Sequence, residues 1–330
     1  MKICRLRLWI ELLKNAYYKP AAPNQTERYL ETLPNIDINI KSGNSLVSRF
    51  SLDSDLKQAL RSSKWTIDSY RIAVATYRNA HNKEEKREMK RLINDIKTNF
   101  RSEIAQNDPK VKRLSKLKGE IFEMSNQGQL FEMSRKEKTA FNKRMKLLNT
   151  QYNKLDVEIE EIKSNKIYEN AFEWRFEFPE VLNDDGDFVG FDVVIGNPPY
   201  VQLQKMGDES DALSRMNYKT FTRTGDIYSL FYELGFNLLK RLGVLTYITS
   251  NKWMRTGYGE STRKFFIEDT NPMILIDFVG VQIFESATVE TNILMLSKET
   301  NHFNTLACAA IDAGGHDAAV KQHGSSFLVE

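Results

Sequence analysis

The 330-residue chain has only two cysteines, Cys4 and Cys308, and four scattered histidines. Two cysteines so far apart do not make a disulfide framework, and the histidines lack the spacing of a structural metal site. No apolar run approaches the roughly 18 residues that a membrane-spanning helix needs. We therefore expect a chain with no metal site and no membrane segment, located in a reducing cytoplasm.

A signal peptide is not expected either, because charged residues interrupt the apolar start "MKICRLRLWIELLK" and no small-residue cleavage site follows. The net charge is only +3, but residues 51–170 hold 26 Lys and Arg against 18 Asp and Glu, which leaves the remainder acidic. Such a concentration is found on nucleic-acid-binding surfaces, but on long helices it is more often a solvated face. Both interpretations stay open.

Helical periodicity dominates the first half of the chain. Apolar residues recur every three or four positions in residues 3–17, 67–77 and 89–100, and again in 114–124 and 141–162. The last two runs predict an antiparallel helical hairpin joined near Gly128. Between these helices, Ile36, Ile38 and Ile40 alternate with polar residues, which predicts a strand that ends at the turn Gly43-Asn44.

From about residue 190 the pattern changes to strands separated by helices. The runs "FDVVIG", "GVLTYITS", "MILIDFVG" and "TNILMLS" predict strands, and residues 226–242 predict a helix closed by Gly243. Alternating strands and helices favour an α/β fold with a mostly parallel sheet. Ligands of such sheets bind beyond the carboxyl ends of the strands.

At one of these ends the sequence reads Asn197-Pro198-Pro199-Tyr200. Two prolines remove two backbone donors and fix two φ angles, so the chain leaves the sheet in a stiff, extended conformation. The Asn197 side chain and the Pro198 carbonyl can both accept hydrogen bonds, and Tyr200 offers a stacking surface worth roughly 1–3 kcal/mol to a base. The tetrapeptide therefore predicts a pocket for an aromatic ring that carries an exocyclic amine, with a rigid turn as the alternative.

The tetrapeptide resembles the catalytic motif of amino-directed, N6-adenine DNA methyltransferases. Further segments resemble the methylase region of the Eco57I-like type IIG restriction-modification enzymes and their relatives in phage defence: "RLRLWIELL", "LPNIDINIKSGNSL", "FEWRFEFPEVL", "GDIYSLFYELGFNLLKRLGVLTYITSNKWM" and "VQIFESATVETNIL". The resemblance covers residues 1–50 and about 171–299. It implies a partial class I, Rossmann-like methyltransferase sheet, with a basic helical or coiled-coil insertion at 51–170 and a linker or truncated tail at 300–330.

The resemblance also implies a function: site-specific methylation of adenine N6 in double-stranded DNA, with S-adenosylmethionine as cofactor, in a bacterial or archaeal cytoplasm. The adenine is flipped out of the duplex. Asn197 and Pro198 would hold its amine, while Tyr200 and Phe284 would stack on its two faces. Phe284 is alternatively a core residue.

Other positions match the family less specifically. Asn44 and Ser45 correspond to a cofactor-approaching turn or form a plain turn, and Asp226 lines the pocket or caps a helix. The segment "SNKW" follows another strand and is expected to line the pocket with three residues: Ser250, Asn251 and Lys252.

The sequence departs from the family pattern in one respect. It contains no Phe-x-Gly-x-Gly-like loop and no acid after a second strand, so the first two strands of the sheet are expected to be missing. We therefore expect no activity from the isolated chain, and a missing N-terminal segment or subunit as its partner. The alternatives are a non-catalytic remnant that binds DNA or a partner through the basic insertion, or a decayed reading frame.

Overall fold

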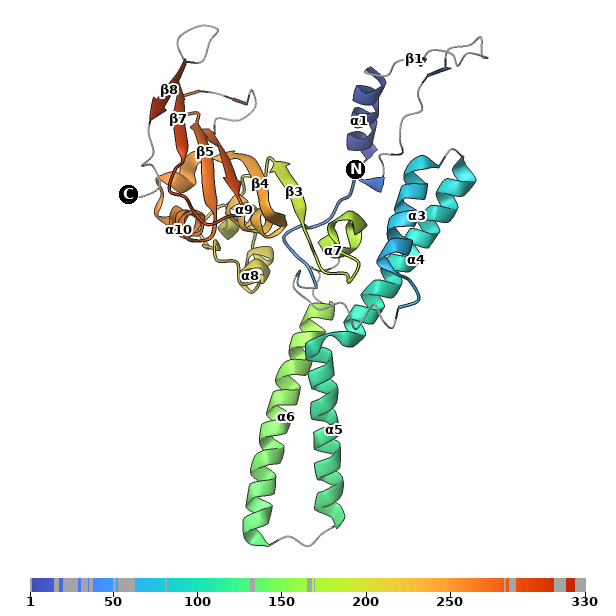
Figure 1. Cartoon of the computed structure of the whole chain (residues 1–330). Coiled ribbons are helices and arrows are strands. Elements are labelled where there is room, and N and C mark those ends of the chain that lie inside the picture. The colour runs from blue at the N-terminus through green and yellow to red at the C-terminus, as the bar shows by residue number, and fades with distance from the viewer. Residues whose placement is uncertain are drawn as a thin grey trace. The chain divides into compact units, whose positions relative to one another are not determined.

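The computed structural model describes residues 2–14, 18–19, 29–30, 35, 38–49, 52, 63–80, 82–130, 134–164, 168, 170–281, 283–284, 289–311 and 319–323. The chain divides into two compact units, Met1–Phe188 and Val189–Glu330. The first unit is mainly helical and the second is built on a sheet (Figure 1). None of the described helices is both long and apolar enough to cross a membrane.

The described helices of the first unit confirm the helical periodicity. They are α1 (Lys2–Lys14), α3 (Ile67–Asn79), α4 (Lys83–Asn107), α5 (Pro109–Leu130), α6 (Arg135–Ser164), the short α7 (Trp174–Glu177) and the 3-10 helix η3 (Pro179–Val181). Thr66 caps α3 by accepting from Ser69 N, and Asn82 caps α4 by accepting from Glu85 N at 2.7 Å. Pro109 separates α4 from α5 because the residue before a proline leaves the helical conformation.

The core of the first unit lies between α3 and α4. Its buried residues include Ile67, Tyr70, Ile96 and Phe100, and two residues from farther along the chain join them, Phe176 and Leu182. The Tyr70 hydroxyl donates to the Phe176 carbonyl oxygen at 2.6 Å. Residues around α7 and η3 therefore pack with the helical insertion. The expected boundary at residues 170 and 171 remains a prediction, since the compact units divide after Phe188.

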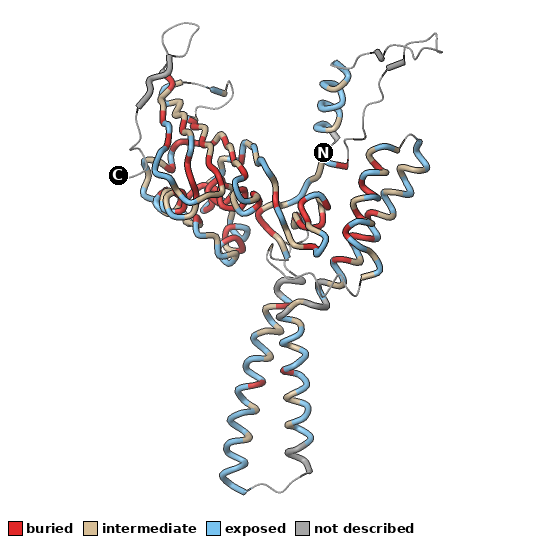
Figure 2. The backbone as a smooth tube through the Cα atoms, in the orientation of Figure 1, coloured by how far each residue is buried: buried red, intermediate tan, exposed pale blue. Residues whose placement is uncertain are grey.

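The predicted hairpin is formed by α5 and α6, which run side by side (Figure 1). α5 continues past Gly128 to Leu130 and α6 begins at Arg135, so the two helices are joined a few residues later than expected. Most of the hairpin is exposed (Figure 2), and among the hairpin residues whose burial is described, the buried ones are Leu117, Leu148 and Ile159. The expected apolar stripes are therefore only half-buried, because most of the contacts of α5 and α6 are with each other.

The predicted strand at residues 36–40 is wrong for the part that the structure describes. Ile38 and Asn39 form a turn, Ile36 lies outside the described residues, and the nearest β-pairing is a single parallel bridge between Asn44 and Ala171. The alternation of apolar and polar residues did not suffice to predict a strand here, because a strand needs a partner strand along its length. A separate two-stranded pair joins β1 (Tyr18–Lys19) and β2 (Tyr29–Leu30).

The second unit holds a six-stranded sheet in the order β3-β4-β6-β5-β7-β8. Its strands are β3 (Phe191–Gly196), β4 (Leu239–Ser250), β5 (Asn271–Asp277), β6 (Thr291–Ser297), β7 (Leu306–Ile311) and β8 (Ala319–His323). Its helices are η4 (Leu203–Lys205), α8 (Asp208–Ser214), α9 (Tyr228–Asn237), η5 (Asn251–Met254), η6 (Gly257–Gly259) and α10 (Glu260–Asp269). This arrangement confirms the expected α/β class.

The expectation of a mostly parallel sheet is corrected by the position of β6. This strand lies between β4 and β5 and runs antiparallel to both, and β8 runs antiparallel to β7. Parallel pairing joins β3 to β4 and β5 to β7. A strand that returns without a crossover helix must run antiparallel, which explains β6. β3, β4, β5 and β7 nevertheless share one direction.

The helix expected over residues 226–242 ends earlier, at Asn237. Leu239 already pairs with Phe191, and Phe191 N donates to the Leu238 carbonyl oxygen at 2.8 Å. Gly243 therefore lies inside β4 and does not close the helix. A Cβ on Gly243 would come within 2.9 Å of two carbonyl oxygens, those of Lys240 and Phe191, so the close approach of β3 favours glycine here.

One face of the sheet is covered by α9 and α10. Leu245 and Tyr247 of β4 pack with Tyr232 of α9 and with Phe265 and Phe266 of α10 in one buried cluster. Leu275 of β5 and Leu294 and Leu296 of β6 complete this core. The covered face fixes the register of the central strands and with it the positions of their carboxyl ends.

Candidate functional site

Two predicted site residues, and one aspartate that the sequence did not single out, lie at the carboxyl ends of strands that share one direction. Asn197 follows β3, Asn251 follows β4, and Asp277 ends β5. Because the intervening β6 is antiparallel to β4 and β5, these three ends lie on the same side of the sheet. We call this set of residues the carboxyl-end rim; it comprises Asn197–Tyr200, Asp226, Ser250–Lys252 and Asp277.

The tetrapeptide is anchored at its aromatic end and open at its amide end. Asn197 is exposed, Pro198 is buried and Tyr200 is half-buried. The Tyr200 hydroxyl donates to the Ile248 carbonyl oxygen at 3.2 Å, and its ring packs edge-on against Tyr228 with centroids 6.1 Å apart. Burial raises the pKa of Tyr200 to about 12, so its hydroxyl stays protonated at neutral pH. The ring is thus fixed while the Asn197 amide remains accessible.

Asp226 is brought to the rim by backbone pairing with the segment after Tyr200. Gln202 bridges to Asp226, and Ile227 N donates to the Val201 carbonyl oxygen at 2.8 Å. The carboxylate is buried and accepts from the Tyr258 hydroxyl at 3.0 Å. The start of α9 has no side-chain cap, so the helix-capping alternative for Asp226 is not what the structure has. Its pocket-lining role stays a prediction.

The segment Ser250–Lys252 turns sharply after β4. Ser250 Oγ accepts from Lys252 N at 3.4 Å, which begins η5, and Lys252 is exposed. Asn251 is buried and its Nδ2 donates to Asp277 Oδ1 at 2.8 Å and to Glu290 Oε2 at 3.4 Å. Asn251 therefore donates hydrogen bonds to two acidic residues that the sequence did not single out.

Arg255 also reaches the two acids, at 3.5 Å from Asp277 and 3.9 Å from Glu290. Burial is the main cause of the raised pKa of Asp277, and repulsion from Glu290 adds to it. A signal for Asp277 existed in the sequence, since it ends the apolar run "MILID". Its pairing with Asn251 could not be seen, because it depends on the order of the strands.

Beneath the rim lies a buried, uncharged hydrogen-bond network that the sequence also did not reveal. Asn292 Oδ1 accepts from Thr249 Oγ1 at 3.0 Å and from Trp253 Nε1 at 3.2 Å. Thr249 Oγ1 lies 2.9 Å from the Tyr232 hydroxyl. This network ties β4, β6, η5 and α9 together, so it keeps the turn after β4 in place.

Phe284 is half-buried in the connection between β5 and β6. Residues 282 and 285–288 of that connection lie outside the described residues. Its expected position opposite Tyr200 stays a prediction, as does the alternative that it is a core residue.

Asn44 and Ser45 belong to the first unit, where they form a turn. Asn44 Oδ1 accepts from Leu46 N at 3.3 Å, and the Ser45 carbonyl oxygen accepts from Trp174 Nε1 at 3.3 Å. The geometry is that of a side-chain-stabilised turn. Their contact with a cofactor stays a prediction. Among the described residues, no three His, Cys, Asp or Glu side chains come together as metal ligands.

A comparison with protein-family models shows the family of the chain. The model of the Eco57I restriction-modification methylase matches residues 1–284. The chain belongs to this family. The match spans both units and includes every predicted site residue, from Asn44 to Phe284.

Individual relatives are similar over part of their length. The type II restriction enzyme and methyltransferase RM.Eco57I of Escherichia coli is 37% identical over 118 residues, which are 34% of this chain and 12% of that protein. The type II methyltransferase M.BstVI of Geobacillus stearothermophilus is 29% identical over 119 residues, 36% of this chain and 21% of that protein. The chain thus matches only a small part of these methylase relatives.

Among solved structures, the type IIG restriction endonuclease BpuSI matches with a TM-score of 0.32 at 13% identity, over 52% of this chain and 24% of that chain.

Proposed function

We propose that this chain captures and orients the target base in a site-specific DNA adenine-N6 methyltransferase of a restriction-modification or phage-defence system. The observation that carries the proposal is the tetrapeptide Asn197–Tyr200 at the carboxyl end of β3, with its amide end exposed and its aromatic end anchored. Membership of a restriction-modification methylase family supports methylation of DNA. The choice of adenine N6 depends on the chemistry of the tetrapeptide.

Asn197 and Pro198 supply the acceptors that an exocyclic amine needs. The side-chain oxygen of Asn197 and the carbonyl oxygen of Pro198 each accept one N–H of adenine N6. Two acceptors draw the nitrogen lone pair out of conjugation with the ring, so the nitrogen becomes a better nucleophile. The fixed φ angles of Pro198 and Pro199 hold these acceptors in position before the base arrives, and such positioning is a large part of catalysis.

Tyr200 receives the base after it has left the duplex. An adenine cannot be reached at N6 while stacked and paired, so it must be flipped out. The contacts of Tyr200 with Tyr228 and with the Ile248 carbonyl oxygen fix its ring without using the hydroxyl for chemistry. The neutral ring is therefore suited to stacking on one face of the flipped base, and Phe284 is the candidate for the other face.

S-adenosylmethionine is the methyl donor that membership of a methylase family implies. The described residues fit this group only in part: the turn at Asn44 and Ser45 is a candidate contact, but Asn44 Oδ1 already accepts from Leu46 N. The sequence holds no Phe-x-Gly-x-Gly-like loop. We therefore expect the 330-residue chain alone to transfer no methyl group, and a polypeptide with such a loop to be needed as its partner.

The test is complementation. The chain is co-expressed with a segment that carries the Gly-rich loop and strand-end acid of a methylase relative, together with a recognition domain, and N6-methyladenine in DNA is measured by mass spectrometry. Asn197→Ala should abolish the product. Asn237→Ala, which removes an exposed amide at the end of α9, is the matched control and should leave it unchanged. Full methylation by Asn197→Ala would refute the proposed mechanism, and methylation by the chain alone would refute the need for a partner.

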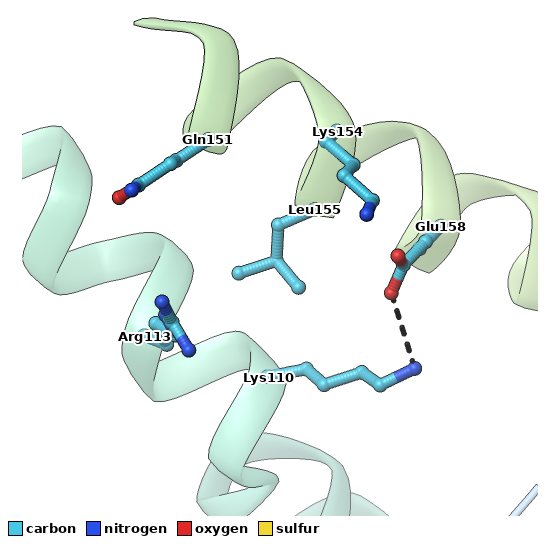
Figure 3. A pocket seen from close by; sticks show the side chains of 6 residues that line it. All are labelled: Lys110, Arg113, Gln151, Lys154, Leu155 and Glu158. Atoms are coloured by element: carbon cyan, nitrogen blue, oxygen red, sulfur yellow. Dashed lines mark ion pairs between the residues drawn. The ribbon is translucent and has the colours of Figure 1, made fainter. Parts of the chain in front are cut away.

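A second candidate function is non-catalytic binding of the DNA backbone by the α5–α6 hairpin. A cavity of about 470 Å³ lies between the two helices, lined by Lys110, Arg113, Gln151, Lys154, Leu155 and Glu158 (Figure 3). Lys110 pairs with Glu158 at 3.3 Å, which leaves Arg113 and Lys154 as the surplus cations of this groove. The double variant Arg113→Gln/Lys154→Gln should weaken DNA binding and flatten its salt dependence. Unchanged affinity at every salt concentration would exclude this contact.

A further inference from the structure

A small cavity in the first unit has an excess of positive charge that neither proposed function uses. It has a volume of about 220 Å³ and lies among α1, residues 38–42, α3, α4 and Glu177. Among the described residues, Glu177 is the only acid that lines it. Four cations line it as well: Arg5, Lys41, Lys90 and Lys97. We call these five residues the basic pocket.

Glu177 is already fully engaged by cations. It lies 2.5 Å from Lys97 Nζ, 3.4 Å from Lys41 Nζ and 3.4 Å from the Arg101 guanidinium, which stands beside the pocket. One carboxylate therefore serves three cations before Arg5 and Lys90 are counted. The positive charge is not balanced by the residues that the structure describes around the pocket.

The surplus of positive charge destabilises the protonated form of Lys97. Lys97 is 9% exposed, and burial lowers its pKa, an effect that Lys41 and Arg101 reinforce and only Glu177 opposes. A buried ammonium is stable when its charge is well compensated. A second negative charge placed in the pocket would provide the compensation that is missing.

Two further groups can donate to such a charge. Lys90 is exposed and forms no ion pair among the described residues. Arg5 uses one terminal nitrogen to donate to the Ile40 carbonyl oxygen at 3.3 Å, while its buried Nε has no hydrogen-bond partner. The pocket thus combines a buried guanidinium nitrogen that has no hydrogen-bond partner with an exposed lysine that forms no ion pair within the described part of the chain.

We propose that the basic pocket binds a phosphate group. Lysine binds phosphate as a point charge, and arginine presents directed donors to its oxygens. The volume is below the roughly 300 Å³ at which pockets begin to hold drug-sized ligands, so one phosphate with little more than its attached group fits best. The phosphate belongs either to a nucleic-acid backbone or to a small free phosphate.

The test uses the full 330-residue chain and two probes: inorganic phosphate, followed by calorimetry, and a short DNA duplex, followed by fluorescence anisotropy at several salt concentrations. Chloride at equal ionic strength is the reference. Lys90→Gln should weaken phosphate binding about tenfold, as expected for loss of one charged hydrogen bond. Lys83→Gln is the matched control, because it removes the same charge from an exposed site on α4 outside the pocket.

The two probes distinguish the source of the phosphate. If Lys90→Gln also lowers the salt slope of DNA binding by about one, the pocket holds a backbone phosphate. If only inorganic phosphate binding falls, the pocket holds a small free phosphate. Equal phosphate and DNA binding by the wild type, Lys90→Gln and Lys83→Gln would overturn the proposal. Arg5→Gln provides an independent variant and should weaken the same probe as Lys90→Gln. None of these measurements depends on methyl transfer.

Discussion

Asp277 in the sheet unit and Glu177 in the helical unit are both partly buried carboxyl groups held by cations, yet their pKa values move in opposite directions. Asp277 has a neutral amide and one arginine as partners, and its pKa is raised, mainly by burial. Burial would also raise the pKa of Glu177, but three neighbouring cations outweigh it and lower the pKa. At the carboxyl-end rim the charge of Asp277 is thus met by one amide and one arginine, whereas the basic pocket has cations in surplus.

This difference separates the ligands that the two sites can hold. A rim with amides and a fixed tyrosine, and without a surplus of cations, suits an uncharged aromatic base. A cavity with surplus cations suits an anion. If both proposals hold, the base and the phosphate groups of DNA are bound by different units of the protein.

The largest expected effect comes from removing the single carboxylate of the basic pocket. Glu177→Met leaves three cations without a partner and should lower the free energy of unfolding by about 3–5 kcal/mol. Lys97→Met should cost clearly less, because Glu177 keeps Lys41 and Arg101. Urea denaturation of the two variants measures both values. A larger loss for Lys97→Met than for Glu177→Met would mean that the pocket has no surplus of cations.

The next effect concerns the neutral network beneath the rim. Asn292→Ala removes the acceptor of Thr249 Oγ1 and Trp253 Nε1 and leaves two buried groups to find other partners. We expect a loss of about 2–3 kcal/mol in the free energy of unfolding. Asn237→Ala, at an exposed position, should change it by less than about 0.5 kcal/mol. Similar losses for the two variants would show that the network does not stabilise the rim.

A smaller effect is expected for the stacking surface. In the complemented enzyme, Tyr200→Ala should weaken capture of the flipped base by about 1–3 kcal/mol. Tyr200→Phe should nearly preserve it, since only the hydrogen bond to the Ile248 carbonyl oxygen is lost, and Tyr200→Trp should also retain a stacking face. Fluorescence of 2-aminopurine at the target position reports base capture. A defect in Tyr200→Phe as large as that in Tyr200→Ala would assign the role to the hydroxyl instead.

Features that depend on residues adjacent in the sequence could be predicted from it, and features that depend on distant residues could not. The position of Asn197 was predictable, because two prolines after an apolar run mark the end of a strand in adjacent residues. The helices were predictable from periodicity, although the end of α9 at Asn237 depended on pairing between Leu239 and Phe191, 48 positions apart in the sequence. A side chain's hydrogen-bond or ion-pair partner could not be predicted when it lies on a strand far away in the sequence.

Asp277 and Asn292 illustrate that limit. They lie opposite each other on β5 and β6, and Asn292 also faces Thr249 of β4. These neighbours exist only because β6 runs antiparallel between two strands that precede it in the chain, which no local pattern indicates. The basic pocket was hidden for the same reason, since Arg5, Lys41, Lys97 and Glu177 come from four distant segments.

The smallest expected effect is that of Asp277→Asn, and it belongs to a pH dependence of stability that has opposite signs at the two carboxyl groups. A carboxyl whose pKa is raised on folding contributes stability below its unfolded pKa and loses it as pH rises through the folded pKa. Asp277 behaves in this way, so Asp277→Asn should stabilise the protein slightly at pH 7 and have less effect at pH 3. Glu177, whose pKa is lowered, contributes stability above its unfolded value and loses it as pH falls. Glu177→Gln should therefore destabilise the protein at pH 7, and the loss should shrink in acid. Thermal unfolding of both variants and the wild type between pH 3 and pH 7 separates the two signs. The same sign for both variants would contradict the view that burial dominates at Asp277 and that neighbouring cations dominate at Glu177.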